Sequence, residues 1–176
     1  DGVTIAGKDA SSYAGNLSLR QIVAQTAWHK ISSVDIIGGD IEALLQKFPE
    51  PKQSSDFLRI INVIPKMGTE LHAKVIPAET GLVEKSVSFT KGCYTGQELV
   101  ARIDSRGNKV PKNLMLIACH EAMSIGDEVE VDGVSIGKLS SVASEGNLTV
   151  GLAYIARKAA ASTEGKVKGK AVTINS

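Results

Sequence analysis

The chain has 176 residues, of which 43% are apolar and 22% charged, and its formal net charge is +1. This composition is typical of a globular protein that buries a core, and the near-neutral charge argues against a dedicated nucleic-acid coat. No apolar run approaches the roughly 20 residues that a membrane helix needs, so we expect no membrane partner. The length suits one full domain or two small ones.

Helical spacing of apolar residues runs through the first part of the chain. Residues 17–25 match the helical period, and so do residues 41–48, which follow a good N-cap at Asp40. A third helix is expected from Ser54 or Ser55 to residue 64, where Pro65 and the turn after it stop the helix. The sequence therefore predicts helices and short strands in this first part, with three helices before residue 65.

The pattern changes after Gly107 to short runs rich in Val, Ile, Leu and Thr. Asp132-Gly133 between two such runs is a strong signal for a two-residue hairpin, and residues 144–147 mark a second turn. Residues 148–154 alternate like a half-buried strand, and a last strand is expected from 168 to 174. Several strands with little helix predict a small β-barrel.

Between the two parts lies the segment Lys91-Gly92-Cys93-Tyr94-Thr95-Gly96-Gln97-Glu98. It is expected to be a loop that runs into a helix, because Thr95 and Glu98 have the spacing of a capping box. Leu99, Val100 and Ile103 should form the apolar face of that helix, and Glu98 and Arg102 the favourable i, i+4 ion pair.

Cys93 lies just ahead of this expected helix and two residues after Lys91. The positive end of a helix dipole and a nearby cation both favour a reactive thiolate. The alternative is that Cys93 is a small buried hydrophobic residue, as most cysteines are. The second cysteine, Cys119, falls in an apolar run and is expected to be buried in a strand.

A metal site within the chain is not expected. A structural zinc site usually needs four Cys and His ligands in paired spacings, whereas the two cysteines form no Cys-x-x-Cys pair. The three histidines, His29, His72 and His120, are scattered singly. So few cysteines indicate a reducing compartment, and we expect the cytoplasm.

The segment from Lys91 to Glu98, with Val100-Ala101-Arg102 and Arg106-Gly107 behind it, resembles the signature of the folate-binding YgfZ family of iron–sulfur-cluster assembly proteins. The sequence around it is also similar to that family, from about Leu17 onward. The similar stretches include Gly68-Thr69-Glu70-Leu71, the run from Ile136 to Ser141, and Gly151-Leu152-Ala153-Tyr154.

The resemblance implies an α+β fold like that of the glycine cleavage T-protein, an aminomethyltransferase, whose domains surround a channel for tetrahydrofolate. Residues 1–108 would be part of the folate-binding domain, with its N-terminal part missing, and residues 109–176 the C-terminal β-barrel. The chain is thus expected to be the C-terminal portion of a longer protein.

The resemblance also implies site residues. Arg59 matches an arginine that lines the folate channel, Asp35 an acidic residue that contacts the pterin, and Glu79 is a third polar candidate. A solvated helix arginine and a turn or capping aspartate are the alternatives for the first two. The functional signature is Cys93 and Lys91, together with Gly92, Tyr94, Gly96, Gln97, Glu98 and Arg102.

The function implied is a tetrahydrofolate-binding accessory factor, without turnover of its own, for the assembly or repair of iron–sulfur proteins, including tRNA-modifying ones. Its partners would be folate and iron–sulfur proteins or assembly factors, and direct nucleic-acid binding is not expected. One alternative is a folate-dependent one-carbon transferase that resembles aminomethyltransferase. Another is a thiol hydrolase or acyltransferase, which would need His72 or His120 as a base beside Cys93.

Overall fold

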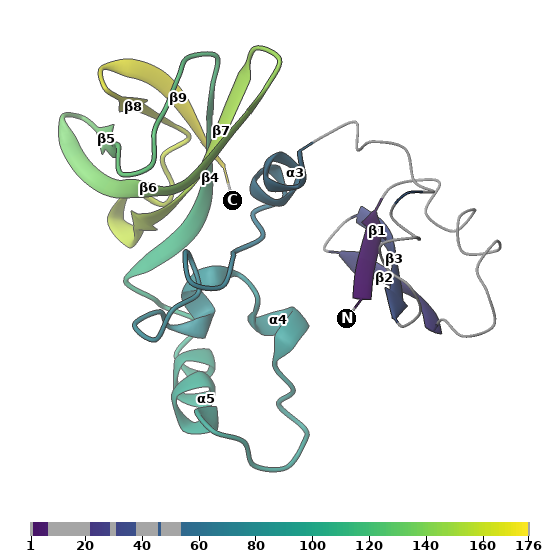
Figure 1. The fold of residues 1–176 in the computed structure, drawn as a ribbon. Coiled ribbons are helices and arrows are strands. Elements are labelled where there is room, and N and C mark those ends of the chain that lie inside the picture. Colours follow the sequence, from purple (N-terminus) through teal and green to yellow (C-terminus); the bar gives the residue numbers. More distant parts are fainter. Residues whose placement is uncertain (1, 7–21, 29–30, 38–45, 47–53, 176) are drawn as a thin grey trace. The chain divides into compact units, whose positions relative to one another are not determined.

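The computed structural model describes residues 2–6, 22–28, 31–37, 46 and 54–175. The chain divides into two compact units, residues 1–52 and residues 53–176 (Figure 1). The fold is α+β, as the sequence predicts, with a few helices and a closed antiparallel β-barrel toward the C-terminus. Within the described residues, no helix is long and apolar enough to span a membrane.

The first unit contains a three-stranded antiparallel sheet in the order β1-β3-β2. Its strands are β1 (Gly2–Ala6), β2 (Ile22–Trp28) and β3 (Ile31–Ile37). The helix predicted over residues 17–25 is therefore wrong from residue 22 onward. That prediction depends on three apolar positions, Leu19, Ile22 and Val23. Pairing of β2 with β3 along its whole length outweighs so weak a local preference. Apart from residue 46, the helix predicted over residues 41–48 lies outside the described residues.

Six antiparallel strands form the closed barrel in the order β4-β7-β6-β5-β8-β9. Pairing of β4 with β9 closes it. The strands are β4 (Lys112–Cys119), β5 (Glu128–Val131), β6 (Val134–Glu145), β7 (Leu148–Ala156), β8 (Glu164–Val167) and β9 (Lys170–Asn175). The predicted barrel is confirmed. The division of the complete protein at residue 108 stays a prediction.

The turns of the barrel follow the sequence closely. Asp132 and Gly133 have φ values of 52° and 74°, the left-handed conformation that a tight type I′ hairpin requires. They join β5 to β6 as predicted, and Gly146-Asn147 joins β6 to β7. Lys168-Gly169 repeats this geometry between β8 and β9, with φ values of 51° and 79°. Strand β8 was not predicted, because it is short and contains a glycine and two charged residues.

Among the described residues, the barrel interior holds the larger of two hydrophobic clusters. It includes Ile117, Leu139 and Ile155, each nearly or completely buried. A second cluster lies on the outside of the barrel, where Phe57 and Ile60 pack against Leu152 and its neighbours on β4 and β7. Strand β7 is therefore buried on both faces over most of its length, and not half-buried as its alternating sequence predicted.

Helix α3 (Ser55–Ile61) carries Phe57 and Ile60. It begins at the predicted N-cap Ser54, but ends before the predicted limit at Pro65. After Ile61 the backbone turns left-handed at Val63, with φ 54°, and the Ile64 N–H reaches back to the Arg59 carbonyl at 2.9 Å. This is a Schellman C-terminus, here with a β-branched residue at a position that glycine usually fills.

Three short helices follow between α3 and the barrel: the 3₁₀ helix η1 (Pro77–Thr80), α4 (Val83–Ser86) and α5 (Gln97–Ser105). The predicted helix after the signature loop is confirmed, but the predicted Thr95 cap is wrong. The N-cap is Gly96, with φ 86°, and no side chain caps the helix. Because glycine adopts this left-handed backbone easily, the N-cap lies one residue later than the capping-box spacing predicts.

Candidate functional site

The signature loop, residues 88–96, runs between α4 and α5 and is largely exposed to solvent. Cys93 is an exposed free thiol, so the alternative of a buried cysteine is wrong for this residue. A Cβ atom added at Gly92 would meet no heavy atom within 4 Å, so there is open space next to the sulfur-bearing residue. The loop therefore offers Cys93 to an approaching partner or reagent.

Local contacts hold the loop. The Lys91 Nζ lies 4.8 Å from the centroid of the Tyr94 ring, a cation–π distance. The Lys91 N–H donates to Ser88 Oγ at 3.2 Å, and the Tyr94 N–H donates to Gln97 Oε1 at 3.4 Å. These contacts of Lys91, Tyr94 and Gln97 stabilise the loop on both sides of Cys93.

Helix α5 carries the rest of the signature. The predicted ion pair is present, with Arg102 Nη2 2.6 Å from Glu98 Oε1, and both side chains are exposed. Of the predicted apolar face only Val100 is buried, whereas Leu99 remains 46% exposed. The helix therefore attaches to the rest of the unit through a small contact.

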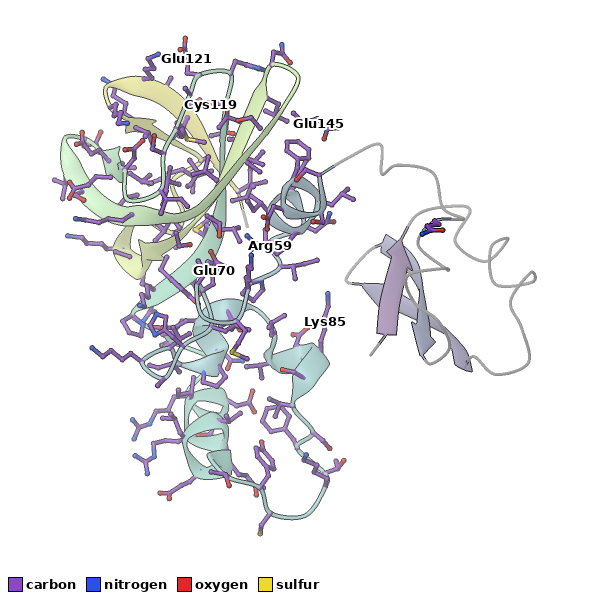
Figure 2. The ribbon with its side chains drawn as sticks, viewed as in Figure 1. Arg59, Glu70, Lys85, Cys119, Glu121 and Glu145 are labelled. Atoms are coloured by element: carbon purple, nitrogen blue, oxygen red, sulfur yellow. The ribbon has the colours of Figure 1, made fainter. Side chains whose placement is uncertain are left out.

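Cys119 lies at the end of β4 and is buried, as predicted. Its S–H donates to the Glu121 carbonyl at 3.1 Å, and the residue belongs to the cluster inside the barrel. Figure 2 shows it among the barrel strands. The two cysteines of the chain thus lie in opposite environments.

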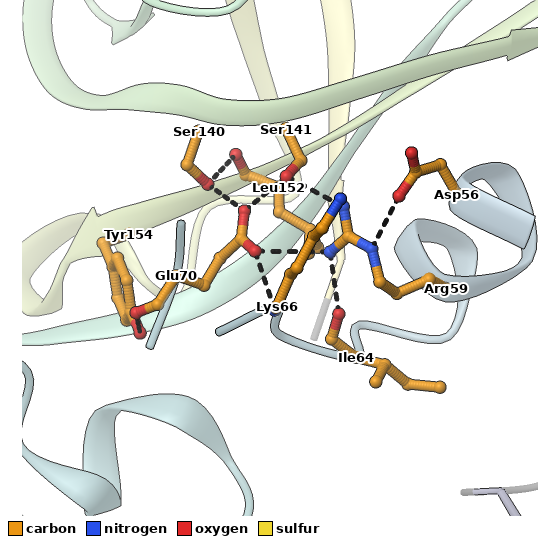
Figure 3. Close-up of polar contacts among 9 residues, drawn as sticks. All are labelled: Asp56, Arg59, Ile64, Lys66, Glu70, Ser140, Ser141, Leu152 and Tyr154. Atoms are coloured by element: carbon orange, nitrogen blue, oxygen red, sulfur yellow. Dashed lines mark hydrogen bonds and ion pairs between the residues drawn. The ribbon is translucent and has the colours of Figure 1, made fainter. Parts of the chain in front are cut away.

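Arg59 is almost completely buried, which excludes the alternative of a solvated helix arginine. Its guanidinium donates to groups of the protein itself. Nε donates to Asp56 at 3.0 Å, Nη1 to the Ile64 carbonyl at 2.9 Å and to Glu70 at 3.2 Å, and Nη2 to Ser141 Oγ at 2.9 Å (Figure 3). The folate role of Arg59 stays a prediction.

Glu79 is 2% exposed and lies in η1. Its Oε2 accepts from the Ile76 N–H at 3.3 Å and lies 3.9 Å from Lys112 Nζ. The Lys112 Nζ lies in turn 4.6 Å from the ring centroid of Tyr154. Asp35, the remaining predicted folate residue, is in β3 of the first unit, and its side chain is outside the described residues.

Among the described residues, the Tyr154 phenol has a pKa that its surroundings raise strongly. Burial, together with the negative charges of Glu79 and Glu70, raises the pKa of Tyr154 to about 12. Its O–H donates to the Glu70 carbonyl at 2.9 Å. The neutral phenol is therefore kept as a hydrogen-bond donor well into the alkaline range.

Sequence reasoning assigned no role to Glu70, Ser140, Ser141 or Tyr154. All four lie in stretches that carry the family resemblance, so a signal was present. The sequence alone does not show that these side chains meet in space, because Glu70 and Ser141 are 71 positions apart in the chain.

Among residues 54–175, no histidine makes a hydrogen bond to Cys93 that could activate it as a nucleophile. The His72 Nδ1 accepts from the Lys74 N–H at 3.3 Å, and the His120 Nδ1 lies 3.1 Å from the Asn147 carbonyl oxygen. Neither histidine makes a hydrogen bond to Cys93. In the same part of the chain, no group of three or more His, Cys, Asp or Glu side chains could hold a metal ion.

The fold and the site define an α+β protein with a C-terminal barrel and an exposed cysteine loop beside it. No family model matches the chain. Curated relatives do match. The tRNA-modifying protein YgfZ of Yersinia enterocolitica is 38% identical over 68 residues, which is 38% of this chain and 21% of the relative. A chloroplastic protein of Arabidopsis thaliana, described as a putative transferase, is 34% identical over 105 residues, or 58% of this chain and 24% of that protein.

An uncharacterized protein of Haemophilus influenzae is 37% identical over 71 residues, or 39% of this chain and 25% of that protein. The chain is therefore a partial homologue of the YgfZ tRNA-modifying proteins and of the plant protein. The matched stretch spans a quarter or less of the length of these relatives.

Proposed function

We propose that this chain is part of a tetrahydrofolate-binding accessory protein for the assembly or repair of iron–sulfur proteins, including tRNA-modifying ones. It works without turnover of its own, in the cytoplasm. Cys93 supplies the reactive group of the signature loop, and Lys91 and Tyr94 shape the loop around it.

The observation that carries the proposal is the exposed thiol of Cys93 in a loop that resembles the YgfZ signature. The similarity to relatives described as tRNA-modifying proteins also supports this proposed function. One thiolate can ligate one iron of a cluster or exchange with a disulfide, but a cluster needs further ligands. A partner protein would therefore have to supply the remaining ligands.

The test is complementation with the complete protein in a bacterial strain that lacks its own YgfZ homologue. Modified nucleosides in tRNA and the activity of an iron–sulfur enzyme are measured. We expect Cys93→Ser to lose most of the complementing activity, at least tenfold, because a hydroxyl neither ligates iron nor exchanges with a disulfide as a thiolate does.

Cys119→Ser is the matched control, since it makes the same chemical change at a buried site. It should retain complementing activity in proportion to the amount of folded protein. Full complementation by Cys93→Ser would reduce Cys93 to a structural residue and remove the basis of the proposal.

Folate binding is tested separately, by calorimetry of the complete protein with tetrahydrofolate. Asp35, Arg59 and Glu79 are the predicted contributors. Substitution of Arg59 by alanine should weaken binding by roughly 1.5–3 kcal/mol, the magnitude of one charge-assisted hydrogen bond. Absence of measurable binding by the wild-type protein would contradict the folate part of the proposal and leave the Cys93 part to its own test.

A second candidate function is a folate-dependent one-carbon transferase like aminomethyltransferase. It is favoured by the match to the plant protein, which is described as a putative transferase and whose similarity covers 58% of this chain. An assay for formation of methylenetetrahydrofolate from an aminomethyl donor separates the two. Turnover that is unaffected by Cys93→Ser would favour the transferase.

A further inference from the structure

Glu70 is a completely buried carboxylate in the turn that follows α3. Oε1 accepts from the hydroxyls of Ser140 and Ser141, each at 2.6 Å. Oε2 accepts from the Lys66 N–H at 2.9 Å and from Arg59 Nη1 at 3.2 Å. Because an ionised carboxylate offers about four lone-pair sites, the hydrogen-bonding capacity of Glu70 is filled (Figure 3).

A β-bulge in β6 brings the two serines to the same carboxylate. Leu139 pairs with Ala153 and Ser141 with Leu152, so that Ser140 is an extra residue in the strand. Successive side chains of a regular strand point to opposite faces, whereas a bulge can turn two neighbours toward the same side. The barrel therefore presents a pair of hydroxyl donors to the α3 segment at this position.

Arg59 supplies the balancing charge. Its side chain is 9% exposed and that of Glu70 is fully buried, so the pair lies away from solvent. The contacts of the guanidinium with Asp56, Ile64 and Ser141, as well as with Glu70, direct it toward the protein interior. A guanidinium held in this way is a structural cation more than a ligand-binding one.

The contacts continue from Glu70 toward α5. The Tyr154 O–H donates to the Glu70 carbonyl, and its ring lies against Lys112, which faces Glu79 in η1. Helix α5, which follows the Cys93 loop, packs against η1. A continuous set of contacts thus links the barrel to the helix that carries the signature.

We propose that Glu70 is the positioning residue that fixes the segment from α3 to η1 on the barrel, with Arg59 as its charge partner. Through η1 this clamp also fixes α5 and the Cys93 loop. The relevance of that loop rests on the proposed function, whereas the clamp itself does not. Loss of folate binding on substitution of Arg59 would then be indirect.

The test is a double-mutant cycle in the complete protein, with Arg59→Met, Glu70→Gln and the two combined. Each single change leaves a buried polar or charged group without its partner, so the unfolding midpoint should fall by on the order of 10 °C. The combined variant removes both charges, so its unfolding midpoint should fall by clearly less than the sum of the two single decreases. The matched control, Arg102→Met with Glu98→Gln in α5, should shift the midpoint by no more than about 1 °C.

Amide hydrogen exchange separates positioning from general stability. In Glu70→Gln, exchange in α5 and η1 should rise at least tenfold, while the strands β5 and β8, away from the clamp, keep their protection. If Glu70→Gln fails to fold, Ser141→Ala, which removes one donor to Glu70, should give the same pattern more weakly.

Three results would overturn the proposal. The decreases in the unfolding midpoint could be additive in the cycle, or they could be as small as in the Arg102/Glu98 control. Protection from amide exchange could also be lost uniformly across the protein in Glu70→Gln. A fourth would be that Arg59→Met abolishes tetrahydrofolate binding while folded Glu70→Gln binds normally, since Arg59 would then contact the ligand. If the wild-type protein binds no folate, the proposed function fails, but the cycle and the exchange pattern still decide the clamp.

Discussion

Two arginine–carboxylate pairs of the same unit have opposite surroundings. Arg59 and Glu70 are buried with every carboxylate oxygen engaged, whereas Arg102 and Glu98 are 55% and 86% exposed on α5. The exposed pair belongs to the signature that makes the sequence recognisable. The buried pair joins α3 to the barrel and lies outside the Lys91–Glu98 signature.

The comparison teaches that the segment with the clearest functional signal contributes little to the fold. The signature loop and α5 bury only Val100 among their apolar residues, while the barrel and α3 contain both hydrophobic clusters. Substitutions in the two regions should therefore separate cleanly, with loss of function in one and loss of stability in the other.

The largest difference is expected between two leucines. Leu139→Ala inside the barrel removes a side chain that is 2% exposed and leaves a cavity, which costs about 2–5 kcal/mol of unfolding free energy. Leu99→Ala on α5 should cost less than about 0.5 kcal/mol, because the side chain is already half exposed. Urea unfolding of both variants checks this, and equal costs would contradict the contrast.

Two glycines give the next comparison. A Cβ atom at Gly137 in β6 would lie 2.5 Å from the Tyr154 carbonyl oxygen, so Gly137→Ala should cost about 1–3 kcal/mol. Gly92 has open space, and Gly92→Ala should leave the unfolding free energy within about 0.5 kcal/mol. Thermal unfolding measures both. A Gly137→Ala variant with unchanged unfolding free energy would mean that β6 and β7 can separate locally without a cost in stability.

Alkaline pH should weaken the barrel side through Tyr154. The pKa of Tyr154 is raised to about 12 in the folded protein, above the value of about 10 in the unfolded chain. Its contribution to stability is therefore complete below pH 10 and declines as the pH rises from about 10 to 12. Denaturation midpoints measured across this range should fall less steeply in Tyr154→Phe, and identical slopes would show that Tyr154 is not responsible.

The smallest effect is expected for the exposed ion pair. Glu98→Gln breaks the contact with Arg102, and an exposed i, i+4 pair contributes about 0.3–0.5 kcal/mol. Salt should remove most of even this difference, because exposed charges are screened. A larger and salt-independent loss in chemical denaturation would place α5 among the elements that hold the fold.

The sequence predicts well where local chemistry decides the structure. Asp132-Gly133 specifies its hairpin because both residues tolerate a left-handed backbone, and the period of α3 identifies Phe57 and Ile60 as its buried face. The Glu98–Arg102 pair follows from helix geometry alone. Each of these depends on neighbours within a few positions.

Prediction from the sequence fails where contacts between distant segments of the chain determine the structure. Arg59 lies off the apolar stripe of α3, and its contacts with Glu70 and with Ser141 of β6 explain why it is nevertheless buried. The end of α3 at a left-handed Val63 and the strand at Ile22–Trp28 are likewise fixed by tertiary and sheet contacts. At Gly96, by contrast, a local backbone preference was available and the capping-box spacing was misleading.

Native-state thiol alkylation of the complete protein tests the central contrast most directly. Cys93 lies exposed in the signature loop and Cys119 is buried in the barrel, so mass spectrometry should find Cys93 modified first across a pH series. Cys119 should react only on the timescale of barrel opening. Equal rates, or faster modification of Cys119, would contradict the division between an accessible functional loop and a protected structural core.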